Sequence, residues 1–100
     1  MAHEFGSGDI FVYKWGYDQT NIEFHQVVKT TTKTVTVRRI EAKAVSEERF
    51  MSDTCVAVPD QFIEQAEPRR KTVKEDGSLR FEFGNAYPWD GKPRERSWYA

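Results

Sequence analysis

Alternating apolar and polar residues give the clearest local pattern in this chain, and they predict β-strands. Residues 9–15 combine aromatic and β-branched side chains, and residues 22–30 place successive side chains on two opposite faces. Residues 33–45 form a third alternating run, and residues 54–58 form a short apolar one that ends at a proline. The pattern indicates a chain built mainly from short strands.

The third run changes phase partway along. Val35 and Val37 share one face, but Ile40 falls on the face that is otherwise polar. A β-bulge at Arg38–Arg39 would bring Ile40 back to the apolar face, because a bulge inserts one extra residue into a strand. We therefore expect a bulge at this dipeptide.

Residues 71–83 carry a hairpin signature. Asp76 and Gly77 separate two strand-like runs, and this dipeptide favours a two-residue type I′ turn in which both central residues have positive φ. The resulting register places Lys71 opposite Glu82 as a cross-strand ion pair. Three apolar residues on one face of the second strand are expected to be buried: Leu79, Phe81 and Phe83.

The remaining connections are predicted to be turns, with one candidate helix. Residues 30–33 are a polar turn, and residues 89–92 are a tight turn that leads to a last strand near residues 96–100. Residues 59–67 are the helical candidate, because Pro59 suits a first helical position.

Together these elements predict a mainly β fold. Five to six antiparallel strands with turns about every dozen residues indicate a small SH3-like or half-open barrel with at most one short helix. The first eight residues resemble an expression-tag and linker remnant and are set apart, so that residues 9–100 form a single β-rich domain. The length of 100 residues fits one small domain with a modest core.

Charge is distributed unevenly along the chain. The net charge is −1, but residues 1–68 carry −4 and residues 69–100 carry +3. A dedicated DNA-binding protein usually has a stronger basic excess, although the last third could present a local basic surface. No apolar run approaches the roughly 18 residues that cross a membrane, so a soluble domain that binds no membrane is expected. Cys55 is the one cysteine, so no internal disulfide is possible, which fits a reducing cytoplasm.

The sequence offers little support for catalysis or for metal binding. Cys55 and His25 are the one plausible nucleophile and base once the first eight residues are set apart. Cys55 lies in an apolar strand, where a buried inert thiol is expected, and His25 is expected to be a surface or cross-strand residue. With one cysteine and one such histidine, no zinc site is expected, and we predict a non-enzymatic protein without metal or cofactor.

Aromatic and basic residues are the candidates for binding. Trp, Tyr and Arg are typical of protein interfaces, and aromatic rings beside arginines are also typical of single-strand nucleic-acid binding. Both partner classes stay open at this point, with core packing as the alternative for the rings, and the oligomeric state is not predicted. The candidate binding residues are Trp15, Tyr17, Gln19, Thr20, Arg38, Arg39, Trp89, Arg94, Arg96, Trp98 and Tyr99.

The stretch "WGYDQTN", residues 15–21, is expected to be an architectural loop. Gly16 lets the backbone turn, while Trp15 and Tyr17 pack on the barrel and meet the turn at residues 89–93 through aromatic contacts. Gln19 and Thr20 are then its outward contacts.

Two segments, "WGYDQTNIEFHQVVKTTTKTVTVRRI" and "YPWDGKPRERSWYA", resemble a group of small orphan proteins encoded by phages, plasmids and integrated elements of bacteria. The resemblance covers residues 9–100 and brings no catalytic residues. It implies an origin on mobile DNA and a role in replication, in regulation or in countering host defence. The leading hypothesis is a non-catalytic interaction protein that binds a host or phage protein in the bacterial cytoplasm, for example an inhibitor of host defence of the anti-CRISPR kind. The alternative is a small nucleic-acid-binding barrel that uses the basic, aromatic last third.

Overall fold

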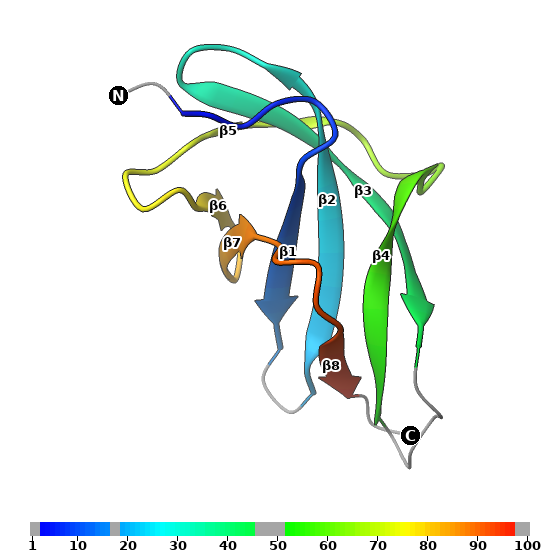
Figure 1. Ribbon diagram of the computed structural model, residues 1–100. Helices are drawn as coiled ribbons and strands as arrows, with labels where there is room; N and C mark the ends of the chain where they lie inside the picture. The colour runs from blue at the N-terminus through cyan, green and yellow to red at the C-terminus, as the bar shows by residue number, and fades with distance from the viewer. Residues whose placement is uncertain (1–2, 17–18, 46–51, 98–100) are drawn as a thin grey trace.

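The structure is a computed structural model, and it describes residues 3–16, 19–45 and 52–97. Those residues form eight antiparallel strands and no helix, in one open sheet of order β6-β7-β1-β2-β3-β4-β8, with β5 paired to β3. The mainly β prediction is confirmed, but the count of five to six strands was too low (Figure 1). The strands are β1 Ile10–Trp15, β2 Asn21–Thr30, β3 Thr34–Ala44, β4 Ser52–Phe62, β5 Arg69–Thr72, β6 Leu79–Phe81, β7 Gly84–Pro88 and β8 Arg94–Ser97.

The sheet buries both of its faces. One cluster, the first core, lies between β1–β3 and strands β6 and β7. The second core lies on the opposite face of β1–β3, against β4 and Trp89. The first core contains Phe11, Tyr13, Val27, Val35, Val37, Leu79, Phe81 and Ala86, and the second contains Val12, Ile22, Phe24, Ile40, Cys55 and Ala57.

The two cores explain the phase change in β3. The register between β2 and β3 runs without a break from Val37 to Ile40, so the bulge expected at Arg38–Arg39 is absent. Val37 enters the first core and Ile40 the second, because the buried face switches along the strand. The shift in register lies in β2, between Val27 and Lys29.

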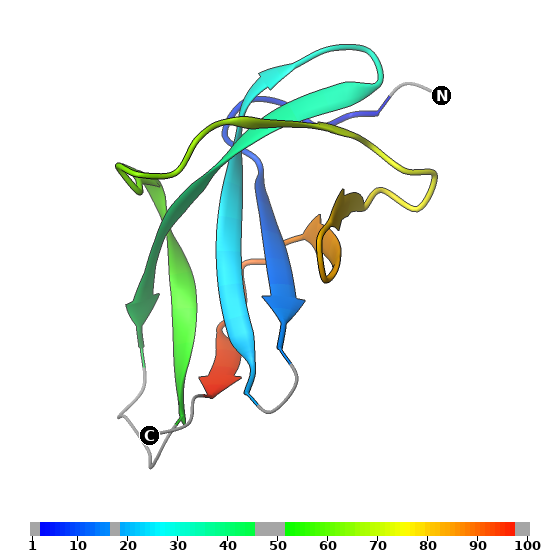
Figure 2. The same ribbon diagram turned by 180° about the vertical axis from the view of Figure 1, so that it is seen from behind.

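The connection from β7 to β8 covers the second core. It crosses the face of β1 and β2 in both views (Figures 1 and 2). The backbone N–H of Trp89 donates to the carbonyl of Ile10, and the Trp89 ring meets Phe24 edge-on at 5.1 Å. The turn expected at residues 89–92 is present, since the carboxylate of Asp90 accepts from the amide of Lys92. The last strand is confirmed as far as Ser97.

The predicted helix at residues 59–67 is wrong. β4 continues through Pro59 to Phe62, with an irregular register against β3. Asp60 has a φ of 66° there, and its side chain and backbone form two hydrogen bonds with the Gln26 amide. These two bonds tie Asp60 to β2 and keep the segment in a strand instead of a helix, which local helix propensity cannot reveal.

The predicted hairpin at Asp76–Gly77 is also wrong in its pairing. β5 pairs with β3, and β6 pairs with β7. Lys74 bonds Ser78 around a three-residue loop, and of the two central residues only Gly77 has positive φ. This is the loop in which a type I turn is followed by a left-handed glycine. Glu82 pairs with Arg69 rather than with Lys71.

The first residues described also pack on the fold. The Phe5 ring lies 4.9 Å from that of Phe11, and the Gly8 amide donates to the carbonyl of Val27. Phe5 therefore contributes to the first core and Gly8 is bonded to β2, although the first eight residues were expected to lie outside the fold.

Candidate functional site

A polar cleft lies where the first hairpin meets β4 and β8. Its volume is about 520 Å³, and side chains from β1, β2, β3, β4 and β8 line it. The Thr20 amide donates to the Ser97 hydroxyl, and the Ser97 amide donates to the Thr20 carbonyl, so the loop after β1 is fixed to β8. The lining residues are Trp15, Thr20, Asn21, Ile22, Glu23, Arg39, Asp53, Arg96 and Ser97.

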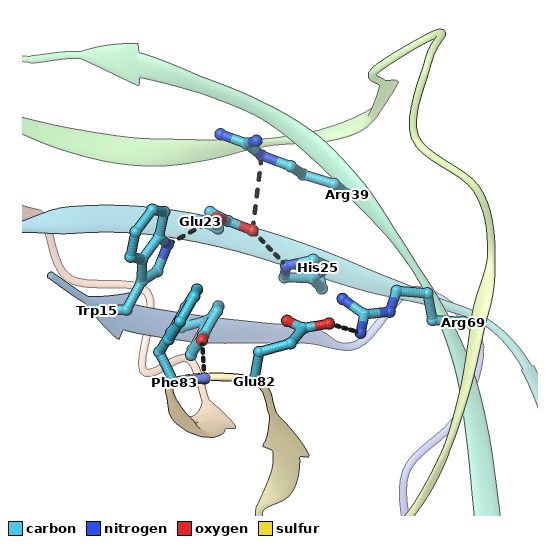
Figure 3. A network of polar contacts seen from close by, with 8 residues as sticks. Trp15, Glu23, His25, Arg39, Arg69, Glu82 and Phe83 are labelled. Atoms are coloured by element: carbon cyan, nitrogen blue, oxygen red, sulfur yellow. Dashed lines mark hydrogen bonds and ion pairs between the residues drawn. The ribbon is translucent and has the colours of Figure 1, made fainter.

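Glu23 is the centre of a hydrogen-bond network in this cleft. Its Oε2 accepts from the Trp15 indole at 2.7 Å, and its Oε1 lies 3.1 Å from His25 Nε2 (Figure 3). Since a carboxylate only accepts, Nε2 of His25 carries the proton. Burial raises the pKa of Glu23, but the hydrogen bond from His25, the charge of Arg39 and the bond from Trp15 outweigh it, and the net pKa is lowered.

The sequence indicated a surface or cross-strand residue for His25, and the structure shows the cross-strand one, paired with Phe11 on β1 and with Arg39 on β3. It is 4% exposed and packs between Tyr13 and Phe81, beside the first core. Its Nδ1 has no hydrogen-bond partner among the described residues. Its hydrogen bond fixes Glu23 Oε1 from the side of the first core.

Asp53 and Arg96 form the opposite wall of the cleft. The two residues are direct partners in the β4–β8 ladder, and Arg96 donates to both oxygens of Asp53 at 2.6 and 2.9 Å. This bidentate geometry is the strong form of an ion pair. The side-chain hydrogen bond to Asp53 is the main reason that the pKa of Arg96 is raised.

An aromatic shelf, Trp15 and Phe83, adjoins the cleft. The Phe83 ring stacks on Trp15 at 5.3 Å and is 71% exposed, so the prediction that Phe83 is buried was wrong. Gly84 follows with a φ of 155°, and the Phe83 amide donates to the hydroxyl of Tyr13. The bend after β6 turns the ring outward while the backbone stays tied to the first core.

The structure brings together some predicted site residues and separates others. Trp15, Thr20, Arg39 and Arg96 meet at the cleft, and Gln19 is half-buried beside it. Tyr17, Trp98 and Tyr99 lie outside the described residues.

The other predicted residues serve the fold. Arg38 donates to the carbonyls of Ile63 and Ala66 and fixes the loop after β4. Arg94 pairs with Asp90, and Trp89 packs on the second core. Because Trp15 packs on the first core, the predicted aromatic contact between residues 15–21 and residues 89–93 is absent at this tryptophan.

Sequence reasoning missed Asn21, Glu23, Asp53 and Phe83. Glu23 lies opposite Tyr13 in the first hairpin and is therefore a diagonal neighbour of Trp15. Such a position is a weak sequence signal for a side-chain contact. Asp53 has no local signal at all, since its partner Arg96 is 43 residues away.

The predicted nucleophile and base, Cys55 and His25, do not come together in the structure. Cys55 belongs to the second core and His25 packs beside the first, so the two lie on opposite faces of the sheet. Burial raises the pKa of the Cys55 thiol. In the described part of the chain no three His, Cys, Asp or Glu side chains gather in a group that could hold a metal ion. No described helix is long and apolar enough to span a membrane.

Comparison with protein-family models, with curated proteins and with solved structures found no match to this chain.

Proposed function

We propose that this protein is a non-catalytic protein-binding module whose contact surface is the aromatic shelf of Trp15 and Phe83 together with the adjoining polar cleft. The observation that carries the proposal is Phe83, which is exposed yet held by stacking and by its backbone bond to Tyr13. A large exposed ring that is already immobilised loses little entropy on binding, and aromatic residues are typical interface hot spots.

The resemblance to proteins of phages and mobile elements supports a host or phage protein as the partner. Inhibition of host defence in the bacterial cytoplasm, in the manner of anti-CRISPR proteins, is the concrete form of the proposal. We also propose the finer fold class. Strands β1–β3 carry a core on each face of one open sheet, which supports an assignment to small SH3-like or half-open barrels.

Nucleic acid remains the alternative partner, and the charges favour it less. Arg69, Arg94 and Arg96 are each paired with a carboxylate of the chain, and Arg38 is hydrogen-bonded to backbone carbonyls. A guanidinium that must first leave an internal carboxylate contributes less to phosphate binding.

The test is retention of a partner from bacterial lysate by the immobilised chain. Phe83→Ala should abolish retention of a defined species, identified by mass spectrometry, that the wild type retains. Tyr87→Ala is the matched control, because Tyr87 is also an exposed aromatic at 50% and lies outside the shelf. Equal retention by wild type and Phe83→Ala would contradict the proposal.

The alternative needs a separate measurement. Labelled single- and double-stranded oligonucleotides should show no binding at low salt if the partner is a protein. Oligonucleotide binding that weakens steeply as salt is raised would instead identify nucleic acid as the partner.

A further inference from the structure

The cleft beside the aromatic shelf contains carboxylates that are already hydrogen-bonded. Both oxygens of Glu23 accept from inside the chain, from Trp15 and His25. Both oxygens of Asp53 accept from Arg96. A ligand that offers mainly donors would therefore have to compete with bonds that the fold has already made.

The same cleft has donors in excess. The Arg39 side chain is 45% exposed, and its Nε lies 4.0 Å from Glu23 Oε1, too far for a hydrogen bond. Arg39 is therefore ion-paired with Glu23 without a hydrogen bond, and within the described residues its five N–H groups can still donate to a ligand. Figure 3 shows this side chain reaching from β3 across Glu23.

Asn21 adds a second, independent donor. Its Oδ1 accepts from Gln19 at 3.4 Å, whereas its Nδ2 is shielded from water and has no partner in the described part of the chain. A shielded donor without a partner costs free energy. Nδ2 lies against Gly16, where an added Cβ would be 2.9 Å from it, and Asn21 also lines the cleft. A ligand acceptor that the Asn21 amide reaches by rotation would recover that cost.

The net charge of the residues that line the cleft determines which kind of anion the cleft can bind. Two arginines face two carboxylates, so the four charged side chains of the lining sum to zero. A neutral cleft does not attract a polyanion over distance, but it can hold one carboxylate in direct contact with Arg39. Trp15 borders both the cleft and the shelf, so an apolar residue next to that carboxylate would meet Phe83.

We infer that the cleft receives the carboxylate of an aspartate or glutamate of the protein partner, bound by Arg39 and Asn21, while a neighbouring apolar residue of the same segment lies on the Trp15–Phe83 shelf. This inference rests on the proposed function and gives the recognised segment its chemistry: acidic, with an adjacent apolar side chain.

The test uses NMR titration of the isotope-labelled chain with two capped tetrapeptides, Gly-Phe-Glu-Gly and Gly-Phe-Gln-Gly. The glutamate peptide should shift the Trp15 indole and Asn21 side-chain signals and bind at least about fivefold more tightly than the glutamine peptide. Arg39→Gln should remove this difference. Arg70→Gln is the matched control, since Arg70 is an exposed arginine on β5, and it should keep the difference.

Equal affinity for the two peptides in the wild type overturns the inference. Inorganic phosphate that displaces the glutamate peptide at lower concentration than acetate does also overturns it, because the site would then prefer phosphate. If neither peptide binds, retention of the partner decides: retention lost with Phe83→Ala but unchanged in Arg39→Gln leaves the proposed function standing and rejects the carboxylate. No Phe83-dependent partner and no peptide binding reject both.

Discussion

The indole N–H of Trp15 donates a 2.7 Å hydrogen bond to Glu23, its diagonal neighbour across the first hairpin. This bond orients the aromatic shelf, because Phe83 stacks on the ring that it fixes. Glu23 is in turn held by His25 from the buried side. The Glu23 carboxylate therefore connects His25, beside the first core, to the Trp15–Phe83 shelf and fixes the position of the contact surface.

Replacing Glu23 should reduce stability and change its pH dependence. The pKa of Glu23 is lower in the folded chain than its ordinary value, so its ionised form favours folding. This contribution is complete above the unfolded pKa and is lost as the pH falls through the lower folded pKa. Glu23→Gln should cost about 1–2 kcal/mol at neutral pH and lose less stability than the wild type on acidification.

Urea unfolding near neutral pH and at about pH 3 measures both effects. Glu64→Gln at an exposed position is the control and should behave as the wild type does. An unchanged acid-dependent loss in Glu23→Gln would show that Glu23 does not carry it.

Gly16 should be intolerant of any side chain. Its φ is 129°, and an added Cβ would lie 2.0 Å from the carbonyl oxygen of Gln19. We expect Gly16→Ala to destabilise the fold by about 2 kcal/mol or more. Gly6→Ala, where a Cβ meets no atom within 4 Å, should stay within about 0.5 kcal/mol of the wild type in the same thermal or urea measurement. Equal stability of the two variants would refute this role of Gly16.

Asp53 and Arg96 should behave as a structural pair. Asp53→Asn and Arg96→Gln should each destabilise the chain, because each leaves a partly buried charge without its bidentate partner. A double-mutant cycle should give a coupling of about 1–3 kcal/mol. Arg39→Gln should cost less than either of these, since Arg39 is half-exposed and its ion pair with Glu23 is long, at 4.0 Å. A coupling free energy near zero would show that the pair does not stabilise the fold, and Arg96 would then be a candidate for contact with the partner.

Cys55 should be protected from modification in the folded state. The thiol is fully buried in the second core, and burial raises its pKa. A maleimide reagent at neutral pH should label it at a rate that follows unfolding, and quickly in denaturant. Rapid labelling of the native chain would mean that the second core opens readily.

The strands with strong alternation could be predicted from sequence, and their pairing could not. β1, β2 and β3 were recognised because each carries apolar residues at strand spacing. The Asp76–Gly77 signal was misleading because β5 finds more partners along β3 than β6 could offer, which is a long-range choice. The outward turn of Phe83 depends on the backbone at Gly84 and on Tyr13, so alternation alone assigned it to the core.

The candidate site could likewise be predicted only where the signal is local. Trp15, Thr20, Arg39 and Arg96 were named because their side chains suit binding. Which arginine is available depends on carboxylates that are distant in sequence: Asp53 occupies Arg96, and nothing comparable occupies Arg39.

The most direct measurement is cross-saturation NMR on the labelled chain bound to the partner that it retains. Saturating the partner should attenuate signals of Trp15, Arg39 and Phe83 first. Signals of Tyr87 and Arg94, which line a different pocket from that of Trp15 and Arg39, should change little. Attenuation centred on Tyr87 and Arg94, with the shelf unaffected, would contradict the account.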